Sequence, residues 1–436
     1  MSIENNNLTV IILAAGVGSR MKSSFPKAMH KLGGSYMIDH LLYKAKKLNP
    51  KQIISVIGED MPELHDHIIT KSDVVHQTKR LGSAHAVYTT KYAHDLKWGV
   101  TLVLYADTPL VDKNSLKKLV NKVATGSCEV CVLAFEKEED NTYGKLVVED
   151  DRLLKIVEHK DANSEQKDIL LCNSGVMAIK TEIIWDLIEK IDNDNAQKEY
   201  YLTDIIKIAN ENNYNCSYVT DLEDNLQGAN SKLELADLEM AFQHFQRMKF
   251  LEAGVQLIDP DTVFFSMDTK IGKDVVIYPN VHILPGSEIK DGAVIYPFTV
   301  IEGAVVGKKC NVGPYARLRP ETILKGENNI GNFVEIKKSV IDKGTKINHL
   351  SYIGDASIGK KSNIGAGTIT CNYNGKEKYN TFVGDNAFVG SNSSLIAPVK
   401  IGDNSMIGAG SVITKSVGNN SLGVTRANQR IFPRKS

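Results

Sequence analysis

The residues after the first apolar run of the chain have the composition of a phosphate-binding loop. Val10 to Leu13 is followed by the small-residue segment Ala14-Ala15-Gly16-Val17-Gly18-Ser19-Arg20, and Lys27 comes directly after Pro26. Small residues let backbone N–H groups approach a phosphate, and two cations can neutralise a triphosphate. A solvated basic loop is the alternative interpretation. A dinucleotide-binding dehydrogenase is disfavoured, because its third glycine is missing and Pro26 breaks the helix it needs.

A carboxylate follows another stretch with the composition of a buried strand. Thr101 to Leu104 is followed by Tyr105-Ala106-Asp107. With further strands expected at 53–57 and 74–76 and helical segments between them, the pattern predicts an α/β domain with a mostly parallel sheet. Asp107 then lies at a carboxyl strand end, which is a natural Mg²⁺ position for nucleotidyl transfer. A helix-cap or turn aspartate would explain the same position.

A second group of chemically capable side chains lies in the C-terminal half. It consists of Arg317, Arg319, Lys337, Lys338, His349 and Tyr352. Two cations suit a sugar phosphate, and an imidazole suits a general base because it ionises near neutral pH. A lone histidine in a β-structure is more often a hydrogen-bonded structural residue, but a purely structural repeat has no reason to collect this set. The segment is therefore expected to carry chemistry.

The elements that must position this group repeat every six residues. The aliphatic positions are Ile271, Ile277, Ile283, Ile289, Ile295 and Ile301 and, in a second phase, Val383, Val389, Leu395, Ile401, Ile407 and Ile413. A period of six fits neither an α-helix nor an alternating strand. It predicts a left-handed parallel β-helix in which each face points one aliphatic residue into a continuous core. Within the repeats, Asn374-Gly375 predicts a turn, so the segment 371–380 is expected to project as a loop.

Bulk properties exclude several classes of protein. The 436 residues include 52 basic and 52 acidic side chains, which leaves no electrostatic footprint for nucleic acid or an anionic membrane. The apolar run from Val10 to Ala15 is too short for a signal peptide, and no segment has the length of a membrane helix. A soluble cytoplasmic protein is expected. Cys128 and Cys131 form a lone C-x-x-C, which we interpret as buried free thiols.

Several motifs resemble those of one enzyme family. Leu-Ala-Ala-Gly-x-Gly-Ser-Arg-Met followed by Pro-Lys resembles the signature of sugar-nucleotide pyrophosphorylases, and Arg317-Leu318-Arg319-Pro320 and the segment 349–355 resemble the acetyltransferase half of a bifunctional family. Nearly the whole chain is similar to the bacterial N-acetylglucosamine-1-phosphate uridylyltransferases that are also glucosamine-1-phosphate acetyltransferases. The resemblance implies an α/β, Rossmann-like nucleotidyltransferase domain over 1–232. A linker helix over 233–253 and a left-handed β-helix acetyltransferase domain over 254–436 are expected to follow.

The resemblance also implies the residues of two sites. In the uridylyltransferase half, nucleotide and sugar would be bound by Leu13, Ala14, Ala15, Gly16, Arg20, Lys27, Gln77, Gly82, Ser83, Tyr105, Ala106, Asp107, Gly144, Glu158, Asn173 and Asn230. Asp107 and Asn230 would hold Mg²⁺. Ser19 and Ser83 stand where the family usually has threonine, and Ala106 replaces a glycine.

In the acetyltransferase half, the resemblance makes His349 the general base. The sugar phosphate would be held by Arg319, Lys337, Tyr352, Asn363 and Lys378, and acetyl-CoA by Ala366, Asn372, Tyr373, Ser391, Ala409 and Arg426. The backbone N–H of Ala366 would meet the thioester oxyanion.

The function implied by the resemblance is the two-step synthesis of UDP-N-acetylglucosamine. Acetyl transfer from acetyl-CoA to glucosamine-1-phosphate would precede uridylyl transfer from UTP, with Mg²⁺ as cofactor. The product would supply cell-wall peptidoglycan and lipopolysaccharide. We expect small-molecule substrates, a homotrimer assembled through the β-helix, and no nucleic-acid or membrane partner. Two alternatives are a monofunctional nucleotidyltransferase with a structural β-helix and a non-catalytic scaffold.

Overall fold

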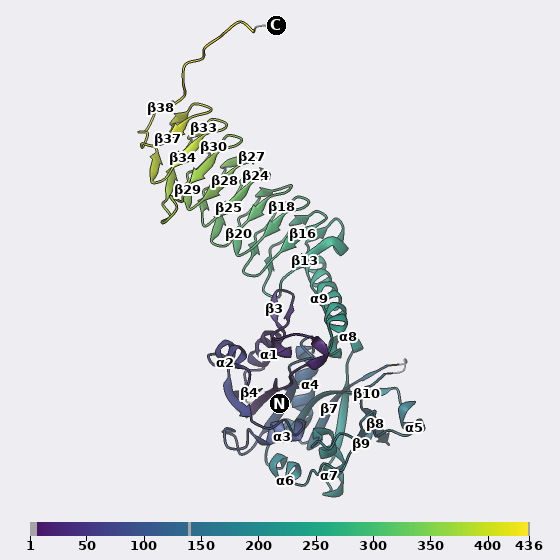
Figure 1. Ribbon diagram of the computed structural model, residues 1–436. Coiled ribbons are helices and arrows are strands. Elements are labelled where there is room, and N and C mark those ends of the chain that lie inside the picture. Colours follow the sequence, from purple (N-terminus) through teal and green to yellow (C-terminus); the bar gives the residue numbers. More distant parts are fainter. Residues whose placement is uncertain (1–6, 138–140, 435–436) are drawn as a thin grey trace. The chain divides into compact units, whose positions relative to one another are not determined.

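The computed structural model describes residues 7–137 and 141–434. The chain divides into two compact units, Met1–Phe242 and Gln243–Ser436 (Figure 1). Helix α9 (Lys232–Glu252) runs across this division, where the sequence predicts a linker helix over 233–253. Within the described residues, no helix combines the length and apolarity needed to cross a membrane.

A mixed sheet forms the centre of the N-terminal unit. Its main strands, in spatial order, are β11 (Cys216–Thr220), β7 (Val130–Glu136), β10 (Leu171–Lys180), β6 (Val100–Tyr105), β1 (Leu8–Leu13), β4 (Gln52–Gly58) and β5 (Asp73–Gln77). Strands β6, β1, β4 and β5 are parallel, whereas β10 is antiparallel to β6 and β7. A hairpin of β8 (Lys145–Glu149) and β9 (Arg152–Val157) joins at β10. Because Leu13 is in register with Tyr105, the loops that leave β1 and β6 meet at one sheet edge.

Alternating side chains of β1 explain why helices cover both faces of this sheet. Val10 and Ile12 enter one buried cluster, and Ile11 and Leu13 enter another. The first cluster includes residues of α1 (Met37–Lys46), α2 (Pro62–Ile68) and α4 (Lys113–Ala124), and the second includes residues of α3 (Ser83–Tyr88), α6 (Ile184–Ile188) and α7 (Ile205–Glu211). The short helices α5 (Ser164–Lys167) and α8 (Glu223–Leu226) lie in connecting segments. The predicted α/β domain is confirmed.

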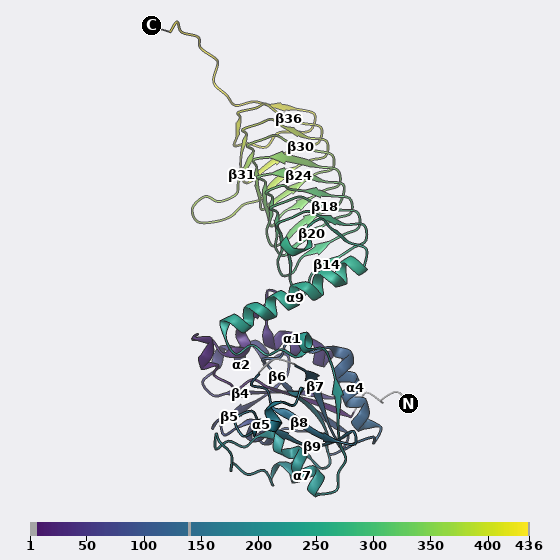
Figure 2. The same ribbon diagram turned by 90° about the vertical axis from the view of Figure 1, so that its right-hand side faces the viewer.

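The C-terminal unit is a left-handed parallel β-helix, as the six-residue period predicts (Figure 2). Its described strands form three parallel sheets, which we call faces 1, 2 and 3. Face 1 runs from β12 (Gln256–Leu257) to β38 (Leu422–Gly423), face 2 from β13 (Val263–Phe265) to β37 (Val412–Ile413), and face 3 from β14 (Lys270–Ile271) to β35 (Val399–Ile401). Both series of six aliphatic residues pack in one core, in which Ile271 is partly buried and the others are buried.

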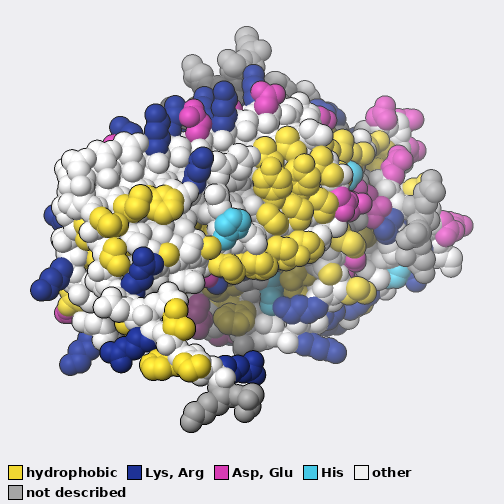
Figure 3. Space-filling model, turned by 90° about the horizontal axis from the view of Figure 1, so that it is seen from above, with side chains coloured by type: hydrophobic (Ala, Val, Ile, Leu, Met, Phe, Trp, Pro, Cys, Tyr) yellow, Lys and Arg dark blue, Asp and Glu magenta, His cyan; other side chains and the backbone are white. Residues whose placement is uncertain are grey.

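The predicted loop at 371–380 leaves the β-helix where face 2 passes to face 3. It connects β31 (Ile369–Cys371) with β32 (Thr381–Val383) and projects from the coils in Figure 2. A bridge between Tyr373 and Lys378 closes its base. On the molecular face seen in Figure 3, Lys and Arg side chains are scattered among acidic and hydrophobic ones and form no continuous patch in this view.

Candidate active sites

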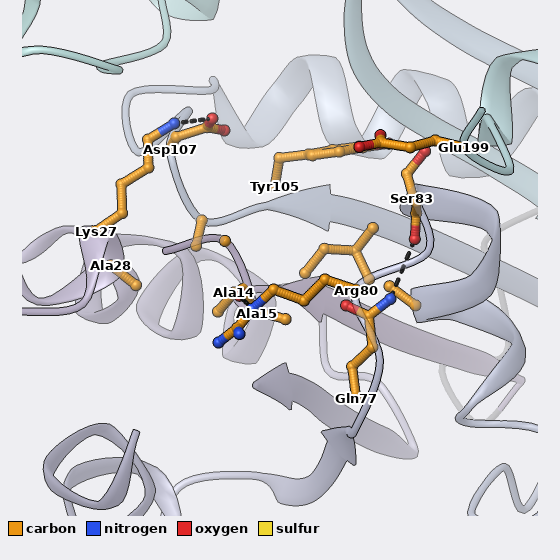
Figure 4. A pocket seen from close by; sticks show the side chains of 15 residues that line it. Ala14, Ala15, Lys27, Ala28, Gln77, Arg80, Ser83, Tyr105, Asp107 and Glu199 are labelled. Carbon is orange, nitrogen blue, oxygen red and sulfur yellow. Dashed lines mark hydrogen bonds and ion pairs between the residues drawn. The ribbon is translucent and has the colours of Figure 1, made fainter. Parts of the chain in front are cut away.

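A pocket with a volume of about 340 Å³ opens at the carboxyl ends of β1 and β6 (Figure 4). Of the sequence-predicted nucleotide and sugar residues, it is lined by Leu13, Ala14, Ala15, Gly16, Lys27, Gln77, Gly82, Ser83, Tyr105, Ala106 and Asp107. No heavy atom lies within 4 Å of a Cβ built on Gly16, so the loop after β1 faces open space. Backbone groups of this loop are therefore accessible to a phosphate.

The turn from Gln77 to Ser83 is held against the segment around Tyr200. Gly82 has φ +119°, and a Cβ there would lie 2.4 Å from the carbonyl oxygen of Tyr200. Only glycine fits such a close backbone approach. The Gln77 side chain donates to the carbonyl of Gly82 at 3.2 Å, and Ser83 Oγ accepts a hydrogen bond from the backbone of Leu202 at 2.9 Å. The bond to Gly82, together with a 3.0 Å contact between Gln77 Nε2 and His85 Nδ1, fixes the Gln77 amide at the pocket wall.

The predicted sugar residues Gly144, Glu158 and Asn173 lie close to one another. The backbone N–H of Asn173 donates to Gly144 at 2.8 Å, and a Cβ on Gly144 would lie 3.4 Å from Glu158 Oε2. Burial raises the pKa of Glu158, although a hydrogen bond from Thr203 at 2.9 Å opposes the shift. Burial also raises the pKa of Tyr105, and the charge of Glu158 raises it further. Glu158 and Tyr105 are therefore both desolvated.

Lys27, Asp107 and Asn230 meet at the other end. Lys27 Nζ lies 2.5 Å from Asp107 Oδ2 and 2.6 Å from Asn230 Oδ1. The backbone N–H of Ala229 donates to the Asp107 carbonyl at 3.0 Å, which brings Asn230 to the aspartate. In addition, Lys44 donates to the carbonyl of Pro109 at 2.7 Å and so anchors the loop after Asp107; burial lowers the pKa of this lysine to about 7.

The pair of oxygens on Asp107 and Asn230 fits a divalent cation. The Lys27 ammonium already stands between them as a cation, and Mg²⁺ prefers carboxylate and amide oxygens with water and substrate phosphate as its further ligands. Within 7–137 and 141–434, no group of three or more His, Cys, Asp and Glu side chains could hold a metal ion.

Arg80 and Glu199 were not among the expected ligands, and five expected residues do not line this pocket: Arg20, Gly144, Glu158, Asn173 and Asn230. Arg80 and Glu199 both line the pocket (Figure 4), and Arg80 Nε donates to the carbonyl of Ala15 at 2.7 Å. Arg80 belongs to the Gln77–Ser83 turn, and its position close to Gly82 in the sequence could have identified it as a pocket residue. Arg20 lines a neighbouring pocket together with Asn230.

In the β-helix, the strand register places four predicted acetyltransferase residues in one column. His349 ends β27 (Lys346–His349), and the pairing of β27, β30 (Asn363–Ile364), β33 (Phe388–Val389) and β36 (Met406–Ile407) aligns it with Ala366, Ser391 and Ala409 in successive coils. This column runs along the edge between faces 1 and 2. Arg426 donates to the carbonyl of Ala409 at 2.9 Å, which places the arginine at the end of the same column.

The residue that orients His349 was not assigned a role from the sequence. Asn332, at the end of β24 (Asn329–Asn332), is in register with His349, and its Oδ1 lies 2.8 Å from His349 Nδ1. An amide oxygen only accepts hydrogen bonds, so this contact favours the tautomer that has the proton on Nδ1 and the lone pair on Nε2. That is the tautomer a general base needs. The sequence gives no signal for this contact, which only the strand register reveals.

A second group lies at the edge between faces 2 and 3. Lys337, at the end of β25 (Glu335–Lys337), follows Arg319 by one coil, and Glu335 Oε1 accepts from Arg319 at 2.8 Å. Asn372, Tyr373 and Lys378 belong to the loop at this edge, and the side chain of Asn372 donates to Asp355. Tyr352 begins β28 (Tyr352–Gly354) on face 2, in register with Glu335.

Asn363 is not brought to either group within one chain. It begins β30 on face 1 and is in register with Lys346, at the opposite strand end from His349. The width of face 3 separates it from Lys337. A single chain therefore distributes the predicted sugar and acetyl-CoA residues over different parts of the prism.

Comparisons with known proteins agree with both folds. A family model described as a MobA-like NTP transferase domain matches residues 10–177, and one described as bacterial transferase hexapeptide matches 268–303 and 380–415. The bifunctional protein GlmU of Paramagnetospirillum magneticum is 46% identical over 98% of this chain and 95% of its own length, and that of Sphingopyxis alaskensis is 43% identical over the same shares. A solved UDP-glucose pyrophosphorylase complexed with UDP-glucose aligns with 55% of this chain and 99% of its own, at 18% identity and a TM-score of 0.45.

The fold and the two family models define a transferase, with a nucleotidyltransferase unit followed by a hexapeptide-repeat unit of the acyltransferase type. The sequence identity to these relatives extends over nearly the full length of the chain and therefore shows its family. The chain belongs to the family of bifunctional GlmU proteins.

Proposed function

We propose that the protein makes UDP-N-acetylglucosamine in two steps on its two units. The β-helix transfers an acetyl group from acetyl-CoA to glucosamine-1-phosphate, releasing CoA. The N-terminal unit then transfers uridylate from UTP to N-acetylglucosamine-1-phosphate, releasing pyrophosphate. The observation that carries the proposal is that a chain of this family has both a pocket of about 340 Å³ at Lys27 and Asp107 and a histidine, His349, whose Nδ1 contacts Asn332 Oδ1.

In uridylyl transfer, the sugar phosphate oxygen attacks the α-phosphorus of UTP in line and expels pyrophosphate. The attacking phosphate is already a nucleophile, so the residues of this site bind, orient and neutralise charge. The loop from Ala14 to Gly16 would offer backbone N–H groups, and Gln77 and Ser83, which line the same pocket, would border the nucleotide. Lys27 offsets charge on the phosphates. Asp107 and Asn230 would hold Mg²⁺, which supplies further charge neutralisation when bound.

In acetyl transfer, His349 Nε2 accepts the proton that the glucosamine ammonium must lose before its nitrogen can attack the thioester. Asn332 holds the ring in the tautomer that can do so. Arg319 and Lys337 would bind the sugar phosphate, and acetyl-CoA would lie along the column from Ala366 to Ala409, whose alignment in successive coils supports this role. The backbone N–H of Ala366 is the proposed donor to the oxyanion.

We further propose a homotrimer in which neighbouring prisms complete each acetyltransferase site. The dispersal of Lys337, His349 and Asn363 over one prism supports it. An apolar column along the edge between faces 1 and 2 supports it as well: Phe298, Tyr315 and Phe333 stack with centroids 4.9 and 5.2 Å apart and are 48%, 48% and 55% exposed. Stacked apolar side chains left in water on one subunit are typical of a surface that another protein covers.

The proposed setting is the cytoplasm, where the product would feed the synthesis of peptidoglycan and lipopolysaccharide. The direct test is to incubate the purified protein with glucosamine-1-phosphate, acetyl-CoA, UTP and Mg²⁺ and to follow free thiol and pyrophosphate separately. The proposal expects thiol release first and pyrophosphate release only after it. Pyrophosphate release from supplied N-acetylglucosamine-1-phosphate without any thiol release from acetyl-CoA would contradict the bifunctional assignment.

A further inference from the structure

The Lys27 ammonium occupies the position that the proposed metal ion would need. Its Nζ atom is within 2.6 Å of both Asp107 Oδ2 and Asn230 Oδ1. The side chains of Lys27 and Asp107 are 13% and 27% exposed, so water screens this pair only partly. A metal ion bound to these two oxygens would lie almost where the Lys27 ammonium lies.

We propose that Lys27 is an internal competitor of the divalent cation, which closes the metal site of the nucleotide-free enzyme. This inference rests on the proposed function of Asp107 and Asn230 as the metal pair. Two cations at the same oxygens repel each other strongly, because the site is partly shielded from solvent. Metal binding to the free enzyme must therefore displace the ammonium, and the apparent affinity for metal is lowered accordingly.

The Lys27 ammonium has a second partner in this proposal, which is a phosphate in the nucleotide pocket. Its side chain lines the nucleotide pocket as well as contacting Asp107, and the ammonium sits on a flexible four-carbon stem. Its backbone is fixed at the short helix Lys27–Met29, where the N–H of His30 donates to the Lys27 carbonyl at 3.2 Å. A nucleotide phosphate can thus draw the ammonium away while the backbone stays in place. Nucleotide and metal then bind cooperatively, and metal alone binds weakly.

The test measures Mn²⁺ binding to the full chain without nucleotide, using the electron paramagnetic resonance signal of free Mn²⁺. Lys27→Met removes the competing charge and keeps a similar side-chain volume. If the ammonium occupies the oxygens about nine-tenths of the time, this variant binds Mn²⁺ roughly tenfold more tightly than the wild type. Lys22→Met is the matched control, since Lys22 is exposed on the same segment, and its Mn²⁺ affinity should stay within about twofold.

Loss of Mn²⁺ binding in Asp107→Ala would show that the measured ion is bound at Asp107. If it is, an unchanged or weaker Mn²⁺ affinity in Lys27→Met would overturn the proposed competition. Equal tightening in Lys22→Met and Lys27→Met would also overturn it, because it would indicate a general charge effect. Thermal unfolding checks that each variant is folded, and Lys27→Gln provides a second neutral replacement. Pyrophosphate release by the wild-type preparation tests the proposed function independently of these outcomes.

Discussion

The side-chain amide oxygen of Asn332 lies 2.8 Å from Nδ1 of His349. The bond connects two coils of the β-helix, because Asn332 and His349 are paired residues of β24 and β27. It sets the tautomer of the imidazole through a neutral acceptor. A charged acceptor at the same position would instead favour the imidazolium, which cannot accept a proton.

Replacing Asn332 tests this role. Asn332→Asp places a carboxylate beside the ring, so we expect the pH profile of acetyl transfer to move toward higher pH by roughly 1 unit. Asn332→Leu removes the bond and should lower acetyl transfer at every pH without moving the profile. The measurement is thiol release between pH 6 and 9, with pyrophosphate release as the unaffected control. Identical profiles in the wild type and Asn332→Asp would refute the role.

Asp204 gives a stability prediction in the N-terminal unit. Burial, followed by the charges of Asp192 and Glu158, raises the pKa of Asp204 from 3.8 to about 6. Between these values the folded state holds a proton that the unfolded state has released, so folding stability falls as pH rises through this window and the loss is complete above about pH 6. Asp204→Asn should therefore raise the melting temperature by roughly 2–4 °C at pH 8 and change it little at pH 4.

Calorimetry at the two pH values measures this difference. Asp168→Asn is the control, because Asp168 is exposed and its replacement should leave the melting temperature unchanged at both. A shift in Asp204→Asn of equal size at pH 4 and pH 8 would show that ionisation of this carboxyl is not the cause.

At the scale of elements, hexapeptide spacing and strand composition were sufficient to predict the fold. The two phases of aliphatic residues mark the inward positions of all three faces, and Val10 to Leu13 and Thr101 to Leu104 lie in the parallel strands β1 and β6. The antiparallel strand β10 and the β8–β9 hairpin give no such periodic signal. Contacts between side chains that are distant in the sequence could not be predicted either. Lys27 contacts Asp107 and Asn230, which lie 80 and 203 positions further along the chain, and only the folded topology brings them together.

The spacing between coils offers a prediction at this scale. Gly331 lies on β24 directly before Asn332, and a Cβ on it would lie 1.9 Å from the carbonyl oxygen of Asn348 on β27. Gly331→Ala must therefore push the two strands apart exactly where Asn332 meets His349. Misplacement of a catalytic group by about 1 Å can cost on the order of 100-fold in rate, and we expect a loss of acetyl transfer of that order.

Uridylyl transfer by Gly331→Ala should stay within about twofold of the wild type, since the change lies in the other unit. Gly418→Ala is the matched control in the β-helix, because the nearest atom to its Cβ would be Ser421 Oγ at an ordinary 3.7 Å. Full acetyl transfer by Gly331→Ala would mean that the β24–β27 spacing does not position the base.

At the scale of the whole molecule, the account requires neighbouring chains to share acetyltransferase sites. Lys337 and Asn363 are both expected at one sugar phosphate, yet the width of face 3 separates them within a chain. We predict that Lys337→Ala and Asn363→Ala are each inactive in acetyl transfer. Trimers containing both variants should regain about one third of the wild-type activity, because one interface in three then pairs intact residues.

This complementation is measured as thiol release by co-expressed, differently tagged variants that are purified through both tags. Light scattering should give three times the mass of one chain for the wild type and for the mixed species. Mixed trimers with no more activity than either variant alone would indicate that each site is built within a single chain.

The central claim, two independent active sites on one chain, is tested most directly by the reciprocal variants Asp107→Ala and His349→Ala. Each is supplied with acetyl-CoA and glucosamine-1-phosphate in one assay, and with UTP, Mg²⁺ and N-acetylglucosamine-1-phosphate in the other. The account predicts that Asp107→Ala loses pyrophosphate release and keeps thiol release, and that His349→Ala shows the opposite pattern. Thiol release that survives in His349→Ala, or loss of both activities in either folded variant, would contradict it.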